Sequence, residues 1–409
     1  MKKSKLFAAT LVVGLCASAA VPVVPKVTTS QDASRRVTVS YTLSDAPAIV
    51  TLSAQTNRGD DVWVDVDDIN LTYVSGDVNK VVPAGDRSLT WLPHKSWPNQ
   101  LITGGNIRIG VKAWATDAPP DYMVVSLAAS NSVAYYSSAR AIPGGVQDMK
   151  YKTEYLVMRK CPAGNVTWRM GSPTTEAGRE ESKEIPHEVT LADDFYIGIY
   201  PVTQRQYELV TGALPGNCAK ANTAHPVTWV SYRDLRGDES AGFDWPNDKH
   251  VVLSGSFVDK LNKLSGLNDF DLPTEAQWEF ACRAGSGAAL YDGHELDAVN
   301  GKSPWLDLLG RYDKNGNALA QVGQYAPNAF GIYDTLGNVW EWCLDWYQES
   351  YVGLDPEKGP ATGSQRVHRA AGYNSNATQC RCAYRGVRAP GYQGGSVGFR
   401  IACAIGGSR

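Results

Sequence analysis

The 409-residue chain lacks any strong excess of charge. Its 39 lysine and arginine residues oppose 42 acidic ones, which leaves a net charge of −3. The basic residues are also spread along the sequence rather than gathered in one stretch. Because proteins that bind nucleic acid or acidic membrane surfaces carry a concentrated basic patch, this pattern argues against both kinds of partner.

The apolar run at the start of the chain is too short to anchor it in a membrane. It extends from Leu6 to Cys16, follows three lysines and precedes the small residues at 17–19. A stable span needs about 20 apolar residues, so residues 1–20 are predicted to be a signal peptide that leaves no stable membrane anchor. Cys16 would suit a lipoprotein, but Leu15 is bulky for that cleavage. Secretion to the periplasm, the cell surface or the extracellular medium is therefore expected.

Cysteine is absent from residues 27–130, and so is any cluster of histidines with carboxylates. This region instead alternates between apolar and polar residues in about seven short segments, for example from Val37 to Leu43 and from Ile107 to Ala115. Such alternation, at a spacing of roughly ten residues, predicts a small all-β sandwich of the immunoglobulin or fibronectin type. A spacer or interaction domain is expected there.

A linker is predicted at residues 131–150, where Pro143 is followed by two glycines. The second domain then covers residues 151–409, in keeping with the two domains expected for a chain of this length. Seven cysteines follow the predicted signal peptide. In an oxidising compartment, an odd number leaves at least one thiol free or paired between chains.

The second domain is organised around residues 328–347, NAFGIYDTLGNVWEWCLDWY. From Val339 onward the pattern alternates, so the indoles of Trp340, Trp342 and Trp346 share one face of a predicted core strand. Elsewhere regular structure is sparse. Capping residues at 203, 256 and 274 predict three helices, and the long irregular stretch at 286–327 calls for a metal, a disulfide or a function.

Two carboxylates, Asp334 and Glu341, bracket the turn before this strand. With backbone carbonyls between them they are suited to a hard cation such as calcium. A solvated acidic rim is the alternative, and the spacing alone favours it.

Six motifs follow one another in the second domain: RKCPAGNVTWRMGSP, FYIGIYPVTQRQYELVTG, HPVTWVS, DLPTEAQWEFACRAG, PNAFGIYDTLGNVWEWCLDWY and the closing CRCAYRG…VGFRIACA. In this order they resemble the formylglycine-generating enzyme family, also called the sulfatase-modifying factor domain. The resemblance implies an α+β class and a C-type lectin-like sulfatase-modifying-factor fold after the small β-sandwich.

The resemblance also implies a structural calcium ion and a disulfide. Residues at the family's calcium site are Asp334, Gly337, Val339 and Glu341, which strengthens the cation alternative. The cysteines that catalytic relatives join are Cys282 and Cys382 here. Cys343 and Cys380 are a possible second pair.

The family's activity transfers poorly. Catalytic members oxidise a substrate cysteine with oxygen, a copper ion and two cysteines just before the motif that is Arg381 to Arg385 here. Residues 374–379 contain no thiol, so copper is unlikely and no catalytic residue is assigned. Cys380 and Cys382 are too close in sequence to replace that pair, although a Cys-x-Cys copper site is conceivable.

The closing segment resembles non-catalytic bacterial relatives, some of which display diversified ligand-binding loops. Two polar runs, at 374–376 and 386–396, are predicted to share one surface, because small polar and Tyr residues on a rigid frame suit recognition. An ordinary solvated loop is the alternative. The predicted binding residues are Asn374, Ser375, Asn376, Arg388, Tyr392 and Gln393.

The resemblance thus implies an exported, non-catalytic binding module for a protein or glycan ligand. The alternative is a formylglycine-generating oxidase that acts on sulfatase cysteines.

Overall fold

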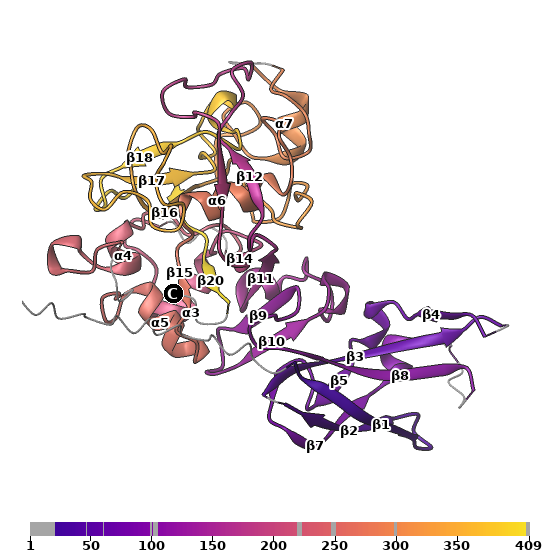
Figure 1. Cartoon of the computed structure of the whole chain (residues 1–409). Helices are drawn as coiled ribbons and strands as arrows, with labels where there is room; N and C mark the ends of the chain where they lie inside the picture. The colour runs from indigo at the N-terminus through magenta and orange to yellow at the C-terminus, as the bar shows by residue number, and fades with distance from the viewer. Residues whose placement is uncertain are drawn as a thin grey trace, which may run out of the picture.

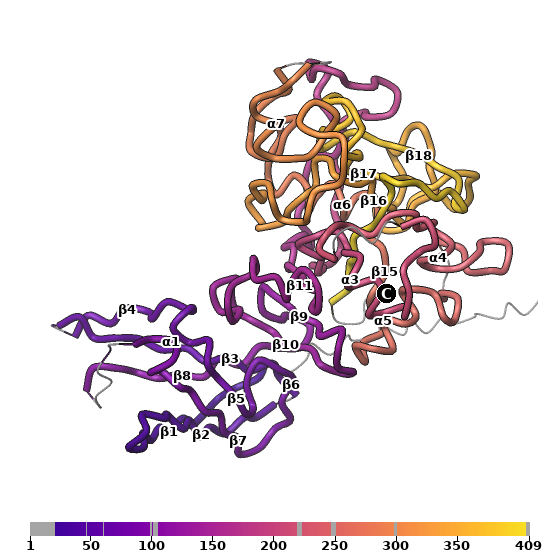
Figure 2. Tube along the Cα trace, turned by 180° about the vertical axis from the view of Figure 1, so that it is seen from behind, coloured from indigo at the N-terminus to yellow at the C-terminus, as the bar shows by residue number. Residues whose placement is uncertain are grey.

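The computed structural model describes residues 21–45, 47–59, 61–98, 100, 105–218, 223–246, 251–297 and 301–405. The predicted signal peptide lies outside these residues. Within them, no helix is both long and apolar enough to cross a bilayer. Figures 1 and 2 show a small all-β domain beside a larger domain of mixed helices and sheets. The predicted α+β class is confirmed.

The first domain is a sandwich of two sheets. One sheet has the order β1-β2-β7-β5, and in the other β3 pairs with β4, β6 and β8. Alternation along β2 explains the packing, because Val37, Val39 and Tyr41 are buried while the residues between them are not. The strands are β1 (Val23–Gln31), β2 (Val37–Ser44), β3 (Ala48–Asn57), β4 (Trp63–Asp65), β5 (Val74–Gly76), β6 (Val81–Val82), β7 (Gly85–Trp91) and β8 (Ile107–Trp114), with the short helices η1 (Asp68–Leu71) and α1 (Pro93–Ser96) between them.

The boundary between the domains lies earlier in the chain than the alternation predicts. The segment at 122–126 falls within the predicted sandwich at 27–130, but it is strand β9 (Tyr122–Ser126) and pairs with β11 (Tyr155–Cys161) of the larger domain. All five of its residues are buried, because both faces of this sheet are covered. The predicted linker at 131–150 is likewise ordered, since it contains β10 (Val133–Tyr136), η2 (Ala139–Ala141) and the buried Ile142.

A six-stranded sheet of order β10-β9-β11-β14-β20-β15 forms the base of the larger domain. Its remaining strands are β11 (Tyr155–Cys161), β14 (Phe195–Gly198), β15 (Phe270–Asp271) and β20 (Ala402–Ala404), and a separate hairpin joins β12 (Thr167–Met170) to β13 (His187–Thr190). The three predicted helices are confirmed as α3 (Gln204–Thr211), α5 (Phe257–Ser265) and α6 (Glu275–Arg283). The capping residues did not predict the short helices, which are α2 (Lys150–Thr153), α4 (Tyr232–Arg236), η3 (Glu239–Ala241) and α7 (Pro304–Leu309).

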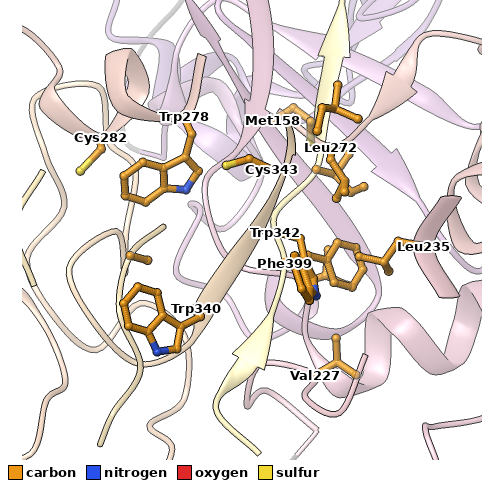
Figure 3. Packing of buried hydrophobic residues seen from close by; sticks show 14 of the residues in the cluster. Met158, Val227, Leu235, Leu272, Trp278, Cys282, Trp340, Trp342, Cys343 and Phe399 are labelled. Carbon is orange, nitrogen blue, oxygen red and sulfur yellow. The ribbon is translucent and has the colours of Figure 1, made fainter. Parts of the chain in front are cut away.

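The predicted core strand is β16 (Trp340–Trp346), and all seven of its residues are buried. It lies within a four-stranded sheet of order β18-β17-β16-β19, formed with β17 (Arg366–Arg369), β18 (Gly386–Arg388) and β19 (Val397–Gly398). Figure 3 shows Trp340 and Trp342 packed among buried side chains from several distant segments. The core strand therefore lies between β17 and β19, and β19 belongs to the closing segment.

Candidate functional site

The turn before β16 has a backbone that only glycine allows at its centre. Gly337 has φ of +105°, and a Cβ there would lie 2.1 Å from the carbonyl oxygen of Arg311. The side chain of Asn338 fixes the turn by exchanging two hydrogen bonds with the backbone of Ala320, at 3.0 and 3.1 Å. This geometry starts the core strand in one register.

Glu341, on the face of β16 opposite the indoles, belongs to a buried ion pair. Arg400 donates to its two carboxylate oxygens at 2.8 and 3.0 Å, and the indole of Trp278 donates at 2.6 Å. Glu341 and Arg400 are both fully buried. The carboxylate charge is thus balanced from within the protein.

Asp334 is also buried, with 1% of its surface exposed, so neither acid lies on a solvated rim. Its Oδ2 accepts a hydrogen bond from the Gly323 N–H at 2.7 Å, whereas its Oδ1 has no partner. Burial is the main cause that raises the pKa of this carboxyl to about 6, and the nearby Glu341 charge adds to it. An unpaired buried acceptor of this kind suits a cation.

The predicted calcium ligands fit the ion only in part. Oδ1 of Asp334 is available, but Glu341 is shared with Arg400, and the carbonyl of Gly337 already accepts the Val339 N–H at 3.0 Å. Among the described residues, no group of three or more His, Cys, Asp or Glu side chains is arranged to hold a metal. Calcium at these positions stays a prediction.

Two arginines of the closing segment, Arg381 and Arg385, point into the protein. Arg381 is buried and donates two hydrogen bonds to Glu184, at 2.7 and 2.8 Å, and a short one to Glu176. Its remaining donors reach the carbonyls of Thr378 and Gly178. The segment is therefore joined to the loop that follows β12.

A second buried network joins the same segment to helix α6. Glu275 accepts from Arg369 at 2.9 Å and from Arg385 at 2.6 and 2.7 Å. Glu279, one turn along the helix, accepts from Arg283 at 2.8 Å and also from Arg369. Both networks fix the backbone beneath the closing loops.

The two cysteines predicted to be bridged are neighbours but are not bonded in the structure. Cys282 and Cys382 are free, buried thiols that share a hydrogen bond. That contact and burial hold the pKa of Cys382 well above its usual range. The disulfide stays a prediction. Cys343 and Cys380 are likewise free and buried.

The first polar run supports the loops more than it exposes binding groups. Ser375 is buried, and its hydroxyl accepts from the Gly372 N–H at 3.1 Å. Asn376 caps the short helix η4 (Ala377–Gln379) by accepting from the Gln379 N–H at 3.2 Å. Asn374 is the one residue of this run that is exposed.

The second polar run does reach solvent. Arg388, Tyr392 and Gln393 are exposed, and the guanidinium of Arg388 lies 5.1 Å from the centre of the Tyr392 ring. Gln393 donates to Asp234 at 2.9 Å, which ties the run to the start of helix α4. These three predicted residues therefore lie together.

The sequence interpretation missed Trp229, which supports the second run. The backbone N–H of Trp229 donates to the carbonyl of Gly394 at 3.0 Å, and a Cβ on Gly395 would contact the Trp229 indole at 3.4 Å. The local signal was the Ser231 to Asp234 capping box directly after it, which starts α4.

Trp340 connects the two polar runs. A Cβ on Gly372 would lie 3.1 Å from its ring, and one on Gly386 would lie 2.8 Å from the same ring. Next to the first run, Ala370 and Ala371 have φ of +79° and +72°, which is strained for residues with a Cβ. Both polar runs therefore lie next to the Trp340 ring, and the strained backbone before the first run is kept in place by the residues packed around it.

The described residues offer no accessible thiol for copper. All seven cysteines after the predicted signal peptide are buried. Burial also raises the pKa of the Cys380 thiol, which disfavours the thiolate that Cu(I) binds.

Comparison with known proteins places this site in a family. The model of the sulfatase-modifying factor enzyme 1-like domain matches residues 147–405. Over 213 residues the chain is 36% identical to the formylglycine-generating enzyme of Streptomyces coelicolor, covering 48% of this chain and 67% of that protein. Over 279 residues it is 30% identical to the enzyme of the same name from Thermomonospora curvata, covering 58% and 90%.

Other similar proteins have different names. The chain is 28% identical to the serine/threonine-protein kinase pkn1 of Chlamydia pneumoniae over 54% of its own length and 34% of the kinase. Among solved structures, PvdO from Pseudomonas aeruginosa gives a TM-score of 0.49 at 25% identity, covering 61% of this chain and 95% of that one. Because this score is below 0.5, the fold assignment rests on the family match and on the sheets described above.

Proposed function

The chain belongs to the sulfatase-modifying factor family, and from this premise we propose that it is an exported, non-catalytic binding module for a protein or glycan ligand. The contact surface would be the closing loops, with Arg388, Tyr392, Gln393 and Asn374 at its centre.

One observation carries the proposal: the family's frame is retained while its reactive group is missing. Arg381 and the network around Glu275 hold the closing segment rigidly. Residues 374–379, where catalytic members have their thiols, contain none, and instead supply a buried serine and a helix cap. A rigid frame beneath loops rich in Tyr and Gly lowers the entropy cost of ordering those loops when a ligand binds.

The relatives named formylglycine-generating enzyme favour an oxidase as the second candidate. Incubation of the purified protein with copper, oxygen and a peptide that carries the sulfatase cysteine motif separates the two. We expect no aldehyde by mass spectrometry, with the Streptomyces coelicolor enzyme as the positive control. Aldehyde formed by the wild type would overturn the proposal, and Cys380→Ser would then be the first variant to test for loss of that activity.

Binding is tested by probing the protein against an oligosaccharide array and against immobilised secreted proteins. Tyr392→Ala and Arg388→Ala should each weaken any specific signal by about tenfold or more, as for truncation of interface anchors. Tyr73→Ala is the matched control, because Tyr73 is an exposed tyrosine on the sandwich domain. Equal losses in all three variants would place binding away from the closing loops.

A further inference from the structure

A cavity of about 450 Å³ lies where the sandwich meets the larger domain. Its lining comes from β6 of the sandwich, from the connection at 116–119, and from strands β9, β10, β14 and β20 of the six-stranded sheet. Small-molecule sites typically measure about 300–1,000 Å³ and often lie between domains. The cavity is therefore large enough for a ligand of its own, well away from the residues of the closing loops.

The charged side chains that line this cavity are acidic, and the nearby Lys160 ammonium is occupied by the carbonyl of Pro119, to which it donates at 2.7 Å. Two carboxylates, Asp117 and Asp269, line the cavity, and none of its described lining residues is Lys, Arg or His. Asp269 is anchored through its carbonyl, which accepts the Ala404 N–H at 3.0 Å. A cation that enters the cavity meets two carboxylates and no competing internal partner among these residues.

The floor of the cavity is apolar and aromatic. Met123, Tyr135 and Tyr196 are buried and line it together. The hydroxyl of Tyr196 is already used, because it donates to the carbonyl of Pro120 at 2.5 Å. Burial, with smaller contributions from Cys403 and Asp269, raises the pKa of Tyr135 to about 12, so this ring stays neutral. Neutral aromatic rings offer an apolar surface against which an aromatic or aliphatic group can pack.

We propose that this cavity binds a small organic cation with an apolar body, such as a protonated amine beside an aromatic or aliphatic group. The ammonium would pair with Asp117 and Asp269, and the apolar body would lie against Met123 and the two tyrosines. This site is independent of the closing loops and of the proposed function.

Calorimetric titration of the full chain tests the charge preference with three probes of similar size. Phenethylamine carries the cation, 2-phenylethanol is its neutral analogue, and phenylacetate is an anion. Phenethylamine should bind about tenfold or more tightly than the alcohol, and phenylacetate should not bind, because a charge-assisted hydrogen bond is lost and then a repulsion is added. Equal binding of amine and alcohol, or no binding of the amine, would overturn the inference.

Variants then locate the site. Asp117→Asn and Asp269→Asn should each lower the affinity for phenethylamine by about tenfold without changing the weak binding of 2-phenylethanol. Asp117 is exposed, so its replacement is not expected to disturb folding. Glu188→Gln, an equal loss of charge on the exposed face of β13, is the matched control. Phenethylamine affinity that is unchanged in both Asp variants would also refute the assignment.

Discussion

Removal of the Arg381 side chain should be among the most destabilising single changes in the larger domain. Arg381→Met would leave Glu176 and Glu184 buried beside one another with no cation, although both are fully covered by protein. Breaking a buried pair by removing one partner costs about 3–5 kcal/mol. For a domain of this size, that loss lowers the melting temperature by about 6–20 °C.

The pH dependence distinguishes this cause from a simple packing defect. In the wild type, burial already raises the pKa of Glu176, against the opposing charge of Arg381. Without Arg381, the Glu176 carboxyl would hold its proton to higher pH in the folded state than in the unfolded one. The loss of stability is therefore largest at neutral pH, and it shrinks as pH falls through the raised pKa of Glu176.

Calorimetric melting of the full chain from pH 7 to pH 4.5 measures both effects. Arg205→Ala, which removes one partner of a partly exposed pair with Glu208, is the control and should cost less than about 1 kcal/mol. Replacement of all three buried members by Met, Gln and Gln should recover most of the loss, because no uncompensated charge remains. A loss below about 1 kcal/mol for Arg381→Met, or one that does not vary with pH, would refute this reasoning.

Three further predictions follow from buried groups. Non-reducing peptide mapping of protein purified from the medium should show Cys282 linked to Cys382, and alkylation of both without reduction would exclude the bridge. Millimolar calcium bound through Asp334 should stabilise the folded state by about 2.7 kcal/mol at a hundredfold excess over Kd, and so raise the melting temperature above that in EDTA at constant ionic strength. Asp334→Asn should abolish that shift, and no shift in the wild type would reject the site. Burial and the charge of Arg388 lower the pKa of His368 to about 3, so only the unfolded state gains its proton as pH falls below about 6.5. His368→Gln should therefore flatten the acid loss of stability, by up to about 4 kcal/mol, and identical pH profiles would contradict this.

Local patterns predicted the elements whose own residues determine them. Indoles at alternate positions from Trp340 to Trp346 predicted a core strand, and the structure has a strand there with both faces buried. Thr203 and Thr274 correctly predicted the N-termini of two helices, because a capping box is complete within four residues. The domain boundary was misplaced because β9 alternates no differently from a sandwich strand, and only its pairing with Tyr155 to Arg159 assigns it to the other sheet.

The buried ion pairs could not be predicted in the same way. Arg381 and Glu176 are separated by 205 residues, and each is of a type that usually stays in water. Charge composition gives no indication of which few carboxylates turn inward. The family motif located Arg381 and Arg385 in the sequence, but their role as the internal supports of the closing loops required the structure.

Polarity alone also failed to separate support from surface in the first polar run. Asn376 and Asn374 are the same residue type two positions apart, yet Asn376 accepts a backbone hydrogen bond while Asn374 faces solvent. The difference was readable, because Gln379 lies three residues after Asn376 and completes a capping box. A polar residue that a nearby backbone N–H can satisfy is therefore a poor candidate for ligand contact. By this criterion Asn374 and Tyr392 are better candidates than Ser375, whose hydroxyl is already bound within its own turn.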